Sequence, residues 1–303
     1  MRVFAGVDGG GTRTTVGLAE EKGREIVRAV GAAGLVDPRD PVASAATVAA
    51  LVRDTARSAG ISAPVEALGA GLAGVGSEAE RVAVELALRH SGVAGRVGVI
   101  SDGEIALEGA LGGGPGILLL AGTGSVAHAR APDGRFERCG GWGMIIGDEG
   151  SGYGIARAAL IACVRAVDGR GEPTRLLPVI LEALKLPDTD ALPPWVGRAP
   201  KSEVAALTVH VLRLAAEGDA GARQIVAQGA DHLASHAVAL VRRLQPWAEP
   251  PRVVPYGGVL RQPLMRNLLA RALAEQLPEA RLVDPVEDAV AGALRYARKL
   301  ALT

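Results

Sequence analysis

Residues 6–14 read Gly6-Val7-Asp8-Gly9-Gly10-Gly11-Thr12-Arg13-Thr14. An apolar run precedes this segment and an alternating stretch follows it, so we predict two strands joined by a glycine-rich loop. The backbone N–H groups and threonine hydroxyls of such a loop face one small space, which suits an anion. Asp8 beside that space indicates that the anion arrives with a metal ion. The alternative for this segment alone is an ordinary glycine-rich hairpin.

Two further segments show a buried-strand pattern that runs into glycines. One is Ile117-Leu118-Leu119-Leu120-Ala121-Gly122-Thr123-Gly124-Ser125, which ends in a loop with two hydroxyls. The other is Arg252-Val253-Val254-Pro255-Tyr256-Gly257-Gly258-Val259, whose paired glycines precede a helical pattern. One such strand end is weak evidence for a ligand site. Three of them along one chain predict a nucleotide site assembled from separate segments.

The composition excludes several classes of protein. The 303 residues carry a formal net charge of zero and no basic run, which argues against nucleic acid or an anionic membrane as the main partner. No stretch approaches the ~20 uninterrupted apolar residues of a membrane-spanning helix. Cys139 and Cys163 are too few for a disulfide framework. We therefore expect a cytoplasmic protein, and no signal peptide because a strand pattern begins at Val3.

The first third of the chain alternates strand and helix patterns, which predicts a largely parallel sheet with ligands at the strand ends. Ser77 and Glu80 form a capping-box pattern at the start of the second helix. Asp102 directly follows the last strand of this part, where a carboxylate can face a ligand. The expected elements are strands near 2–7, 13–19, 25–30, 67–72 and 97–101, a helix over about 41–58 and another from residue 77.

The stretch Gly112-Gly113-Gly114-Pro115-Gly116 holds neither a helix nor a strand and is the best candidate for a hinge or domain junction. After it the opening pattern recurs, with a strand, a loop of glycines and hydroxyls, and two more strands. We interpret this as a second copy of the first topology. The remaining expected elements are strands at 126–131 and 135–140, helices over about 149–167, 175–184, 200–217 and 219–244, a surface connection at 186–200, and a strand–helix–strand–helix section at 252–300.

A long glycine block lies in the middle of the chain, with Cys139-Gly140-Gly141-Trp142-Gly143 followed by Gly147-Asp148-Glu149-Gly150-Ser151-Gly152-Tyr153-Gly154. With residues 6–14, Asp102 and residues 121–125, this block resembles the N-acetylglucosamine kinase branch of the BadF/BadG/BcrA/BcrD family, within the actin–hexokinase–Hsp70 superfamily. The resemblance implies an α/β fold of two ribonuclease H-like (actin-like ATPase) domains with a central ATP/sugar cleft. It implies domains at 1–112 and 113–285, with a helix at 286–303 packed back on the first, and a homodimer.

The resemblance also implies a role for individual residues. Asp102 would accept the proton of the attacking sugar hydroxyl, and Asp8 would order a hydrated Mg²⁺. The ATP phosphates would meet Gly10, Gly11, Thr12 and Thr14 from one domain and Thr123, Gly124 and Ser125 from the other. The adenosine would lie near Gly257, Gly258, Ala289 and Ala293. The sugar would lie against Gly141, Trp142, Gly143 and Asp148.

Two positions depart from the family pattern. Relatives carry asparagines that face sugar hydroxyls, and Leu35 and Val126 stand at those positions here. An apolar side chain leaves a hydroxyl unpaired, so we expect weaker discrimination among sugars unless Asp37 compensates. The prediction is an ATP-dependent kinase that converts N-acetylglucosamine to its 6-phosphate. The alternatives are a glucosamine or hexose kinase, or an ATPase activator of a dehydratase or reductase that holds an iron–sulfur cluster through cysteines such as Cys139.

Other motifs have simpler explanations. Residues 69–74 match the dinucleotide pattern G-x-G-x-x-G, but they fall largely within a strand pattern and lack the acidic residue that should follow. We therefore predict that these small residues serve close packing or pass near the sugar. His232 and His236 stand one helical turn apart without a third zinc ligand, so we predict a solvated helix face. A sugar-sensing regulator would need a DNA-binding segment before Val3, so we do not expect that function.

Overall fold

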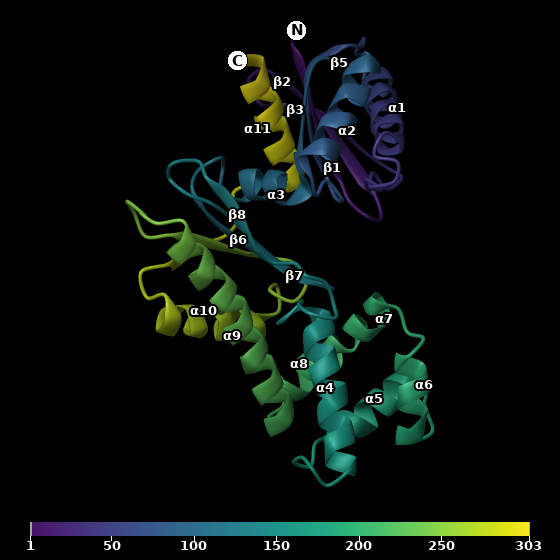
Figure 1. The fold of residues 1–303 in the computed structure, drawn as a ribbon, viewed down its shortest axis with the longest axis vertical. Coiled ribbons are helices and arrows are strands. Elements are labelled where there is room, and N and C mark those ends of the chain that lie inside the picture. Colours follow the sequence, from purple (N-terminus) through teal and green to yellow (C-terminus); the bar gives the residue numbers. More distant parts are fainter. Residues whose placement is uncertain (1, 303) are drawn as a thin grey trace. The chain divides into compact units, whose positions relative to one another are not determined.

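The computed structural model describes residues 2–302, which form two compact units, drawn in Figure 1. The first unit contains the chain up to Gly114 and again from Pro285, and the second is Pro115–Asp284. The change from one unit to the next therefore falls inside the glycine-rich stretch at residues 112–116. Each unit is an α/β structure built around its own five-stranded sheet.

The sheet of the first unit has the order β3-β2-β1-β4-β5. Strands β1, β2 and β3 form an antiparallel meander, and β4 and β5 run parallel to β1. The hairpin and the strand–helix alternation expected from the sequence are both present. The strands are β1 (Val3–Gly9), β2 (Thr14–Glu20), β3 (Glu25–Gly31), β4 (Val65–Leu72) and β5 (Ala94–Ser101), and the helices are α1 (Ala43–Ser58), α2 (Glu78–His90), α3 (Asp102–Ala110) and α11 (Ala289–Leu302).

The alternation of side chains along β1 divides the core of this unit between the two faces of the sheet. Val7 lies in a buried cluster with residues of α1 and α2, whereas Phe4 packs with Val290 and Leu294 of α11. The helix can approach the second face closely because that face carries glycines. A Cβ atom at Gly69 would lie only 2.5 Å from the carbonyl oxygen of Ala293. This confirms close packing as the reason for the G-x-G-x-x-G pattern.

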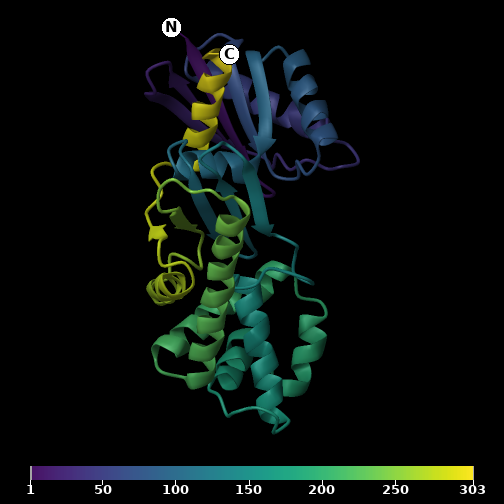
Figure 2. The ribbon, with the colours of Figure 1, turned by 60° about the vertical axis from the view of Figure 1, so that its left-hand side comes forward.

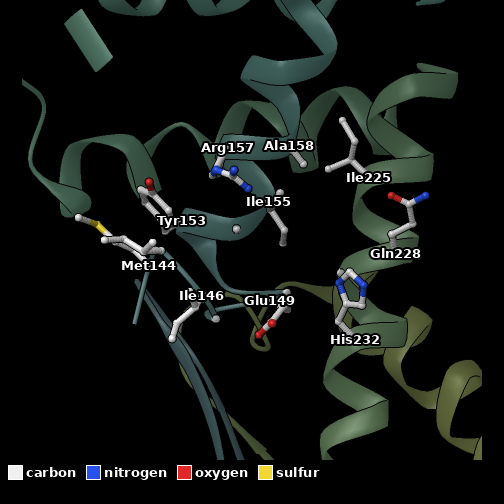
Figure 3. Close-up of a pocket in the computed structure, with 15 residues that line it drawn as sticks. Met144, Ile146, Glu149, Tyr153, Ile155, Arg157, Ala158, Ile225, Gln228 and His232 are labelled. Carbon is white, nitrogen blue, oxygen red and sulfur yellow. The ribbon is translucent and has the colours of Figure 1, made fainter. Parts of the chain in front are cut away.

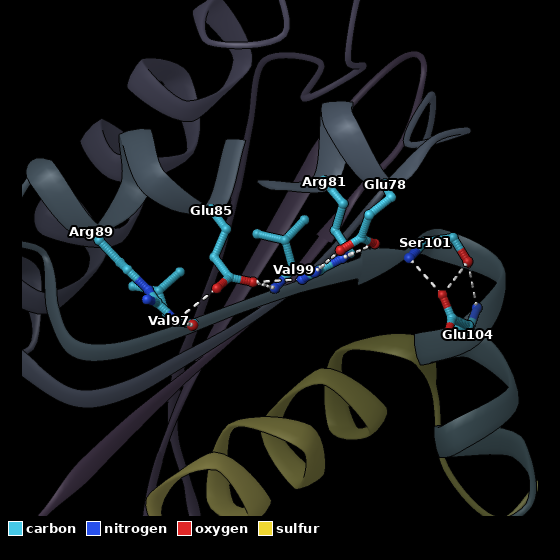
Figure 4. Close-up of polar contacts among 8 residues, drawn as sticks. All are labelled: Glu78, Arg81, Glu85, Arg89, Val97, Val99, Ser101 and Glu104. Carbon is cyan, nitrogen blue, oxygen red and sulfur yellow. Dashed lines mark hydrogen bonds and ion pairs between the residues drawn. The ribbon is translucent and has the colours of Figure 1, made fainter. Parts of the chain in front are cut away.

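Polar side chains of α2 and α3 cover the edge strand β5, as Figure 4 shows. Glu85 accepts a hydrogen bond from the Val99 backbone N–H at 3.3 Å. Ser101 and Glu104 form a capping box that begins α3, so Asp102 is the first residue of that helix. The capping box predicted at Ser77 is confirmed at the start of α2.

The second sheet repeats the strand order of the first. Its order is β8-β7-β6-β9-β10, with the first three strands antiparallel and the last two parallel to β6. The predicted second copy of the opening topology is therefore confirmed. The strands are β6 (Gly116–Ala121), β7 (Ser125–Arg130), β8 (Phe136–Gly140), β9 (Arg252–Tyr256) and β10 (Arg281–Leu282).

The helices of the second unit differ from the expected ones in three places. Residues 148–150 are a loop, because Asp148 and Gly150 have positive φ angles, and Ser151 caps the helix that follows. The expected helix at 200–217 is two helices, since Leu207 forms a tighter turn to the Val204 carbonyl. The expected surface connection contains a 3-10 turn (Thr189–Ala191) and a short helix that begins with prolines, which suit a first helical turn.

The helices of this unit are α4 (Gly152–Val167), α5 (Leu176–Leu184), α6 (Leu192–Val196), α7 (Lys201–Ala206), α8 (Thr208–Ala216), α9 (Ala220–Arg243) and α10 (Pro263–Gln276). Figure 2 shows the long helix α9 beside α4. Ala127 and Ala129 of β7 lie in the buried cluster to which both helices contribute. Between residues 2 and 302, no helix combines the length and the apolar character that crossing a bilayer requires.

A buried histidine in the second sheet makes stability depend on pH. His128 of β7 is 9% exposed and stacks on Phe136, with ring centroids 5.6 Å apart. Burial lowers the pKa of His128 to about 4, and the nearby Arg138 charge contributes in the same direction. The unfolded chain therefore binds more protons than the folded protein between about pH 6.5 and pH 4.

We expect the free energy of unfolding to fall as the pH decreases through this window, with up to about 3 kcal/mol due to His128. The His128→Gln variant lacks the titrating ring and should lose less stability between pH 7 and pH 4.5, measured by urea unfolding. His90→Gln removes an exposed histidine of α2 and is the matched control. An unchanged pH dependence in His128→Gln would contradict this assignment.

Candidate functional site

The loop between β1 and β2 presents the residues predicted to meet phosphate. The Gly10 N–H donates a hydrogen bond to the Arg13 carbonyl at 2.9 Å and closes the loop. Gly11 and Thr12 are exposed, and a Cβ atom at Gly11 would meet nothing within 4 Å. The loop can therefore offer backbone N–H groups and one threonine hydroxyl to an anion.

The position of the Thr14 side chain does not fit the expected contact with phosphate. Its side chain is 0% exposed, and its hydroxyl has no hydrogen-bond partner among residues 2–302. A Cβ atom at Gly34 would lie 2.7 Å from that hydroxyl oxygen, so the backbone of residue 34 covers it. This burial argues against a contact between the Thr14 hydroxyl and a phosphate, because the strand turns the side chain into the core.

Two other carboxylates of the first unit affect the pKa of Asp8. Asp8 lies near the carboxyl end of β1 and Asp102 directly after β5, and both strands run parallel to β4, so their ends share one edge of the sheet. Burial raises the pKa of Asp8, and the charges of Asp102 and Asp288 raise it further. The charges of Arg13 and Arg28 oppose this effect.

Asp102 combines access to solvent with an environment that favours proton acceptance. Its side chain is exposed, and the Gly103 N–H donates a hydrogen bond to Asp102 Oδ1 at 2.9 Å. The protein around the carboxyl group removes part of its hydration, and this raises the pKa of Asp102 above the ordinary value for aspartate. A carboxylate with a raised pKa is a stronger base, which suits proton abstraction from a hydroxyl.

Asp288 had no recognised signal in the sequence. It precedes α11, and its Oδ1 accepts a hydrogen bond from the Ala291 N–H at 2.9 Å. The Arg28 guanidinium binds its carboxylate. Only the return of α11 to the first sheet brings Asp288, which lies 280 residues further along the chain, close to Asp8.

The residues present fit a magnesium ion that arrives with a nucleotide. Within residues 2–302, no three histidine, cysteine or carboxylate side chains are close enough to hold a metal ion by themselves. Magnesium in nucleotide sites keeps several waters and uses one or two carboxylates plus the phosphates. Asp8 meets that requirement, because a cation would relieve the repulsion from Asp102 and Asp288.

The second unit carries its own glycine loop between β6 and β7. The Gly122 N–H donates to the Gly124 carbonyl at 2.9 Å, and Thr123 is exposed at the tip. Ser125 is buried, and its hydroxyl donates to the Glu149 carbonyl at 2.7 Å. The Ser125 hydroxyl therefore joins the loop to the glycine block, and Thr123 is the hydroxyl that remains accessible.

Asp148 supports this loop from beneath. Its side chain is 3% exposed, and Oδ1 accepts a hydrogen bond from the Ser125 N–H at 3.0 Å. Oδ2 forms an ion pair with Lys201 Nζ at 2.6 Å. These interactions occupy both carboxylate oxygens, so a role of Asp148 in sugar binding stays a prediction. Lys201 was not found from the sequence because it lies 53 residues from Asp148 in a segment without a motif.

A pocket of about 420 Å³ joins two of the segments predicted to bind nucleotide. Gly122 and Thr123 line one side, and Gly258 lines another. Gly257 has φ +107°, and a Cβ atom there would lie 2.4 Å from the Ala121 carbonyl oxygen, so only glycine fits this turn. Sequence reasoning missed the part of the lining that comes from α7, α8 and the start of α10, which includes Ser202, Ala205, Thr208, Val209 and Gln262.

The burial of Ala293 argues against its expected contact with adenosine. Ala293 is 0% exposed in α11 of the first unit, and its backbone packs against Gly69. Ala289 begins the same helix and is half-buried. The spacing of small residues along α11 reflects helix-to-sheet packing.

The glycine block exposes one aromatic side chain. Gly140, Gly141 and Gly143 all have positive φ angles, which turn the chain sharply on either side of Trp142. Trp142 is 64% exposed, and the Arg138 guanidinium carbon lies 5.3 Å from its ring centroid. Of the two positions that depart from the family pattern, Leu35 is 52% exposed in the first unit and Val126 is half-buried beside Gly141.

Behind this block, Figure 3 shows a second pocket, of about 270 Å³, between α4 and α9. Glu149 and His232 point into it together with Tyr153.

The predicted solvated face is wrong for His236, which is 9% exposed and packs beneath Gly140. Burial lowers the pKa of His236, and its Nε2 lies 3.9 Å from Glu149 Oε2. His236 therefore belongs to the packing beneath the glycine block, whereas His232 is exposed as expected.

A sequence model of the BadF/BadG/BcrA/BcrD ATPase family matches residues 5–297. The chain belongs to this family. Solved structures of sugar kinases with a two-domain fold match over nearly the whole chain.

Relatives of this family member span its full length. An N-acetylmuramic acid/N-acetylglucosamine kinase from Clostridium acetobutylicum is 29% identical over 98% of this chain and 99% of the relative. An N-acetyl-D-glucosamine kinase from Dictyostelium discoideum is 27% identical over 96% of each chain. A crystal structure from Chromobacterium violaceum, named as an N-acetylglucosamine kinase, has a TM-score of 0.77 and 30% identity over 97% of this chain and 98% of its own.

Gly124 offers a direct test of the support beneath the second loop. A Cβ atom there would lie 2.6 Å from Asp148 Oδ1 and 2.9 Å from Lys201 Nζ. We expect Gly124→Ala to lower the free energy of unfolding by roughly 1–3 kcal/mol, because the ion pair between buried Asp148 and half-buried Lys201 must move. Thermal unfolding without ligand measures this effect.

Gly122→Ala is the matched control in the same loop, since a Cβ atom at Gly122 would meet nothing within 4 Å. Its melting temperature should stay near that of the wild type. Equal destabilisation by the two substitutions would contradict the conclusion that Asp148 and Lys201 support the loop between β6 and β7.

Proposed function

We propose that the protein transfers the terminal phosphoryl group of ATP to the 6-hydroxyl of N-acetylglucosamine. The main support for this proposal is the pocket lined by Thr123 and Gly258, because it joins a predicted phosphate-binding loop to the glycine turn that is expected to contact adenosine. The relatives that span the whole chain are named for kinase activity on N-acetylated amino sugars. The ROK glucokinase from Streptomyces griseus, solved with glucose and AMPPNP, shares the fold at 17% identity and a TM-score of 0.60.

In this proposal the protein contributes positioning and charge, which is what phosphoryl transfer requires. Backbone N–H groups at Gly11 and Gly124, with the Thr12 and Thr123 hydroxyls, hold the phosphates, and the Gly10 N–H closes the first loop. Asp102 accepts the proton of the sugar hydroxyl as that oxygen attacks phosphorus. Asp8 orients the hydrated magnesium ion, which supplies positive charge to the phosphate oxygens when bound.

The sugar is proposed to lie against Gly141, Trp142 and Gly143. An exposed indole offers an apolar face to a sugar ring, and the positive φ angles of the glycines let the backbone approach closely. Leu35 and Val126 replace amides that would pair with hydroxyls. Binding of N-acetylglucosamine is therefore weaker than in a site with both amides, and the loss falls on KM rather than kcat.

We also propose a cytoplasmic homodimer. Two free cysteines suit a reducing compartment. Met144, Ile145 and Ile146 form an exposed apolar surface in the second unit, which suits contact with a second copy. Light scattering of the purified protein measures the assembly directly.

The central catalytic test is Asp102→Asn. Loss of the base should lower kcat by roughly 10²–10⁴-fold, while ATP binding changes little. A coupled assay for ADP release gives kcat, and calorimetry with a non-hydrolysable ATP analogue gives the affinity. Asp133→Asn, an exposed aspartate paired with Arg135, is the control and should keep wild-type turnover. Near-normal kcat in Asp102→Asn would refute this role.

The sugar assignment is tested with N-acetylglucosamine, glucosamine and glucose in the same assay. We expect N-acetylglucosamine to be phosphorylated with a high KM and some turnover of the others. Val126→Asn should lower the KM for N-acetylglucosamine by up to about tenfold, because the amide can pair with a hydroxyl. If no sugar is phosphorylated and the purified protein shows iron–sulfur absorbance, the ATPase activator is the correct function.

A further inference from the structure

We propose that the Gln262 amide binds the edge of the purine base of the phosphoryl donor, so that the enzyme accepts GTP and ITP as well as ATP. This inference rests on the proposed kinase function and adds a class of donor nucleotide and the residue that selects it. Its basis is a recess that continues the pocket lined by Thr123 and Gly258.

The recess has a volume of about 330 Å³ and lies beside the pocket of about 420 Å³ in the second unit. The two share Val209, Leu212 and Gln262. Gly122 and Thr123 line the larger pocket but not the recess. Because the phosphates and the base lie at opposite ends of a nucleotide, phosphates held at Thr123 direct the base toward the shared residues and into the recess.

The walls of the recess are mainly apolar. Helix α8 supplies Val209, Leu212 and Ala216, and the start of α10 supplies Pro263 and Leu264. Val209 is 61% exposed, so its methyl groups are available to pack against a flat ring. Apolar walls of this kind give affinity for any purine, because burial of apolar surface has no direction. The choice among bases therefore depends on the polar side chains of the recess.

The polar lining residues of the recess are Arg213 and Gln262, and the arginine already has a partner. Arg213 Nη1 forms an ion pair with Glu217 Oε1 at 2.6 Å. Gln262 is exposed, and its amide has no hydrogen-bond partner among residues 2–302. It stands at the N-cap of α10 without a side-chain hydrogen bond to that helix, and glutamine is not among the residues that cap helices well. The Gln262 amide is therefore available to a ligand.

An amide can pair with either kind of purine edge. Adenine has a hydrogen-bond donor at N6 beside an acceptor at N1, whereas guanine and hypoxanthine have an acceptor at O6 beside a donor at N1. A glutamine amide carries an acceptor oxygen and a donor NH₂ group side by side. Half a turn of its terminal torsion exchanges the two, and that torsion is two-fold and soft. Gln262 thus pairs with all three bases from one position, and the recess does not exclude GTP or ITP.

The first test compares ATP, GTP and ITP as phosphoryl donors for N-acetylglucosamine in the wild type. Chromatography of the sugar phosphate gives kcat/KM by the same readout for each nucleotide. We expect the values for the three nucleotides to agree within about tenfold, because each base keeps its hydrogen bonds to the amide. ITP lacks the 2-amino group of GTP, so equal use of these two nucleotides identifies N1 and O6 as the atoms that are recognised.

Gln262→Glu changes the hydrogen-bonding pattern without removing the side chain. A carboxylate only accepts hydrogen bonds, so it pairs with the guanine N1–H but faces the lone pair of adenine N1. We expect the ratio of kcat/KM for GTP to kcat/KM for ATP to rise by at least about tenfold, mainly through KM. Gln262→Ala should lower kcat/KM for all three nucleotides by about two- to tenfold and keep the wild-type ratio.

Both variants are expected to fold. A glutamate at the start of a helix is favoured by the helix dipole, and alanine removes no cap hydrogen bond, which thermal unfolding checks. Gln276→Glu, the same change at an exposed glutamine at the far end of α10, is the matched control and should leave the GTP/ATP ratio unchanged. Calorimetry with non-hydrolysable analogues of ATP and GTP gives this ratio as dissociation constants, independently of any sugar.

Any of three results would overturn the inference. In the wild type, GTP could be more than about tenfold poorer than ATP, which would mean that the recess selects adenine. Gln262→Glu could keep the wild-type ratio in both assays, which would mean that the amide does not contact the base. ITP could be much poorer than GTP, which would assign recognition to the 2-amino group. A wild type that phosphorylates no sugar with any nucleotide would instead refute the kinase function, and the dissociation constants of the analogues would still decide the role of Gln262.

Discussion

The close packing of α11 on the first sheet is the constraint on which the rest of that unit depends. A Cβ atom at Gly6 would lie 2.6 Å from the Leu294 backbone nitrogen, and one at Gly69 would lie 2.5 Å from the Ala293 carbonyl oxygen. The helix can occupy this position only because the strands beneath it carry glycine. Its arrival brings Asp288 near Asp8, where the Asp288 charge adds to burial and to the Asp102 charge in raising the pKa of Asp8. A packing requirement thus contributes to the electrostatics of a candidate phosphate site.

In the second unit, a buried carboxylate has a comparable organising role. Asp148 accepts a hydrogen bond from Ser125 and pairs with Lys201, so the glycine loop and α7 are held by one side chain. The Ser125 hydroxyl is also committed to the interior. The hydrogen bonds of Ser125 therefore hold the loop in one conformation, in which the Thr123 hydroxyl and backbone N–H groups remain accessible. Preorganised donors of this kind stabilise developing charge without reorganising during the reaction.

The sequence predicted the strands, the first hairpin, the Ser77 cap and the repeated topology, because side-chain period and turn chemistry act over a few residues. It failed where distant parts of the chain decide the local structure. The helix was expected from about residue 149, yet left-handed backbone at Asp148 and Gly150 keeps these residues in a loop, and Asp148 bonds to Ser125. His236 looks like one of a solvated pair, but it lies beneath Gly140, which the period of a helix cannot reveal.

The amino-acid sequence alone determined the fold class, the family motifs and the glycine-rich junction, since each depends on the order of residues along a short segment. Tertiary structure decided which of the motif side chains face solvent. The Thr14 hydroxyl and Ala293 are buried, and Asp148 forms an ion pair with Lys201. Arg138 lies over the Trp142 ring and has no acidic partner among the described residues. The physical reason is that burial and ion pairing depend on every segment that arrives at a position, and those segments lie far apart in the chain.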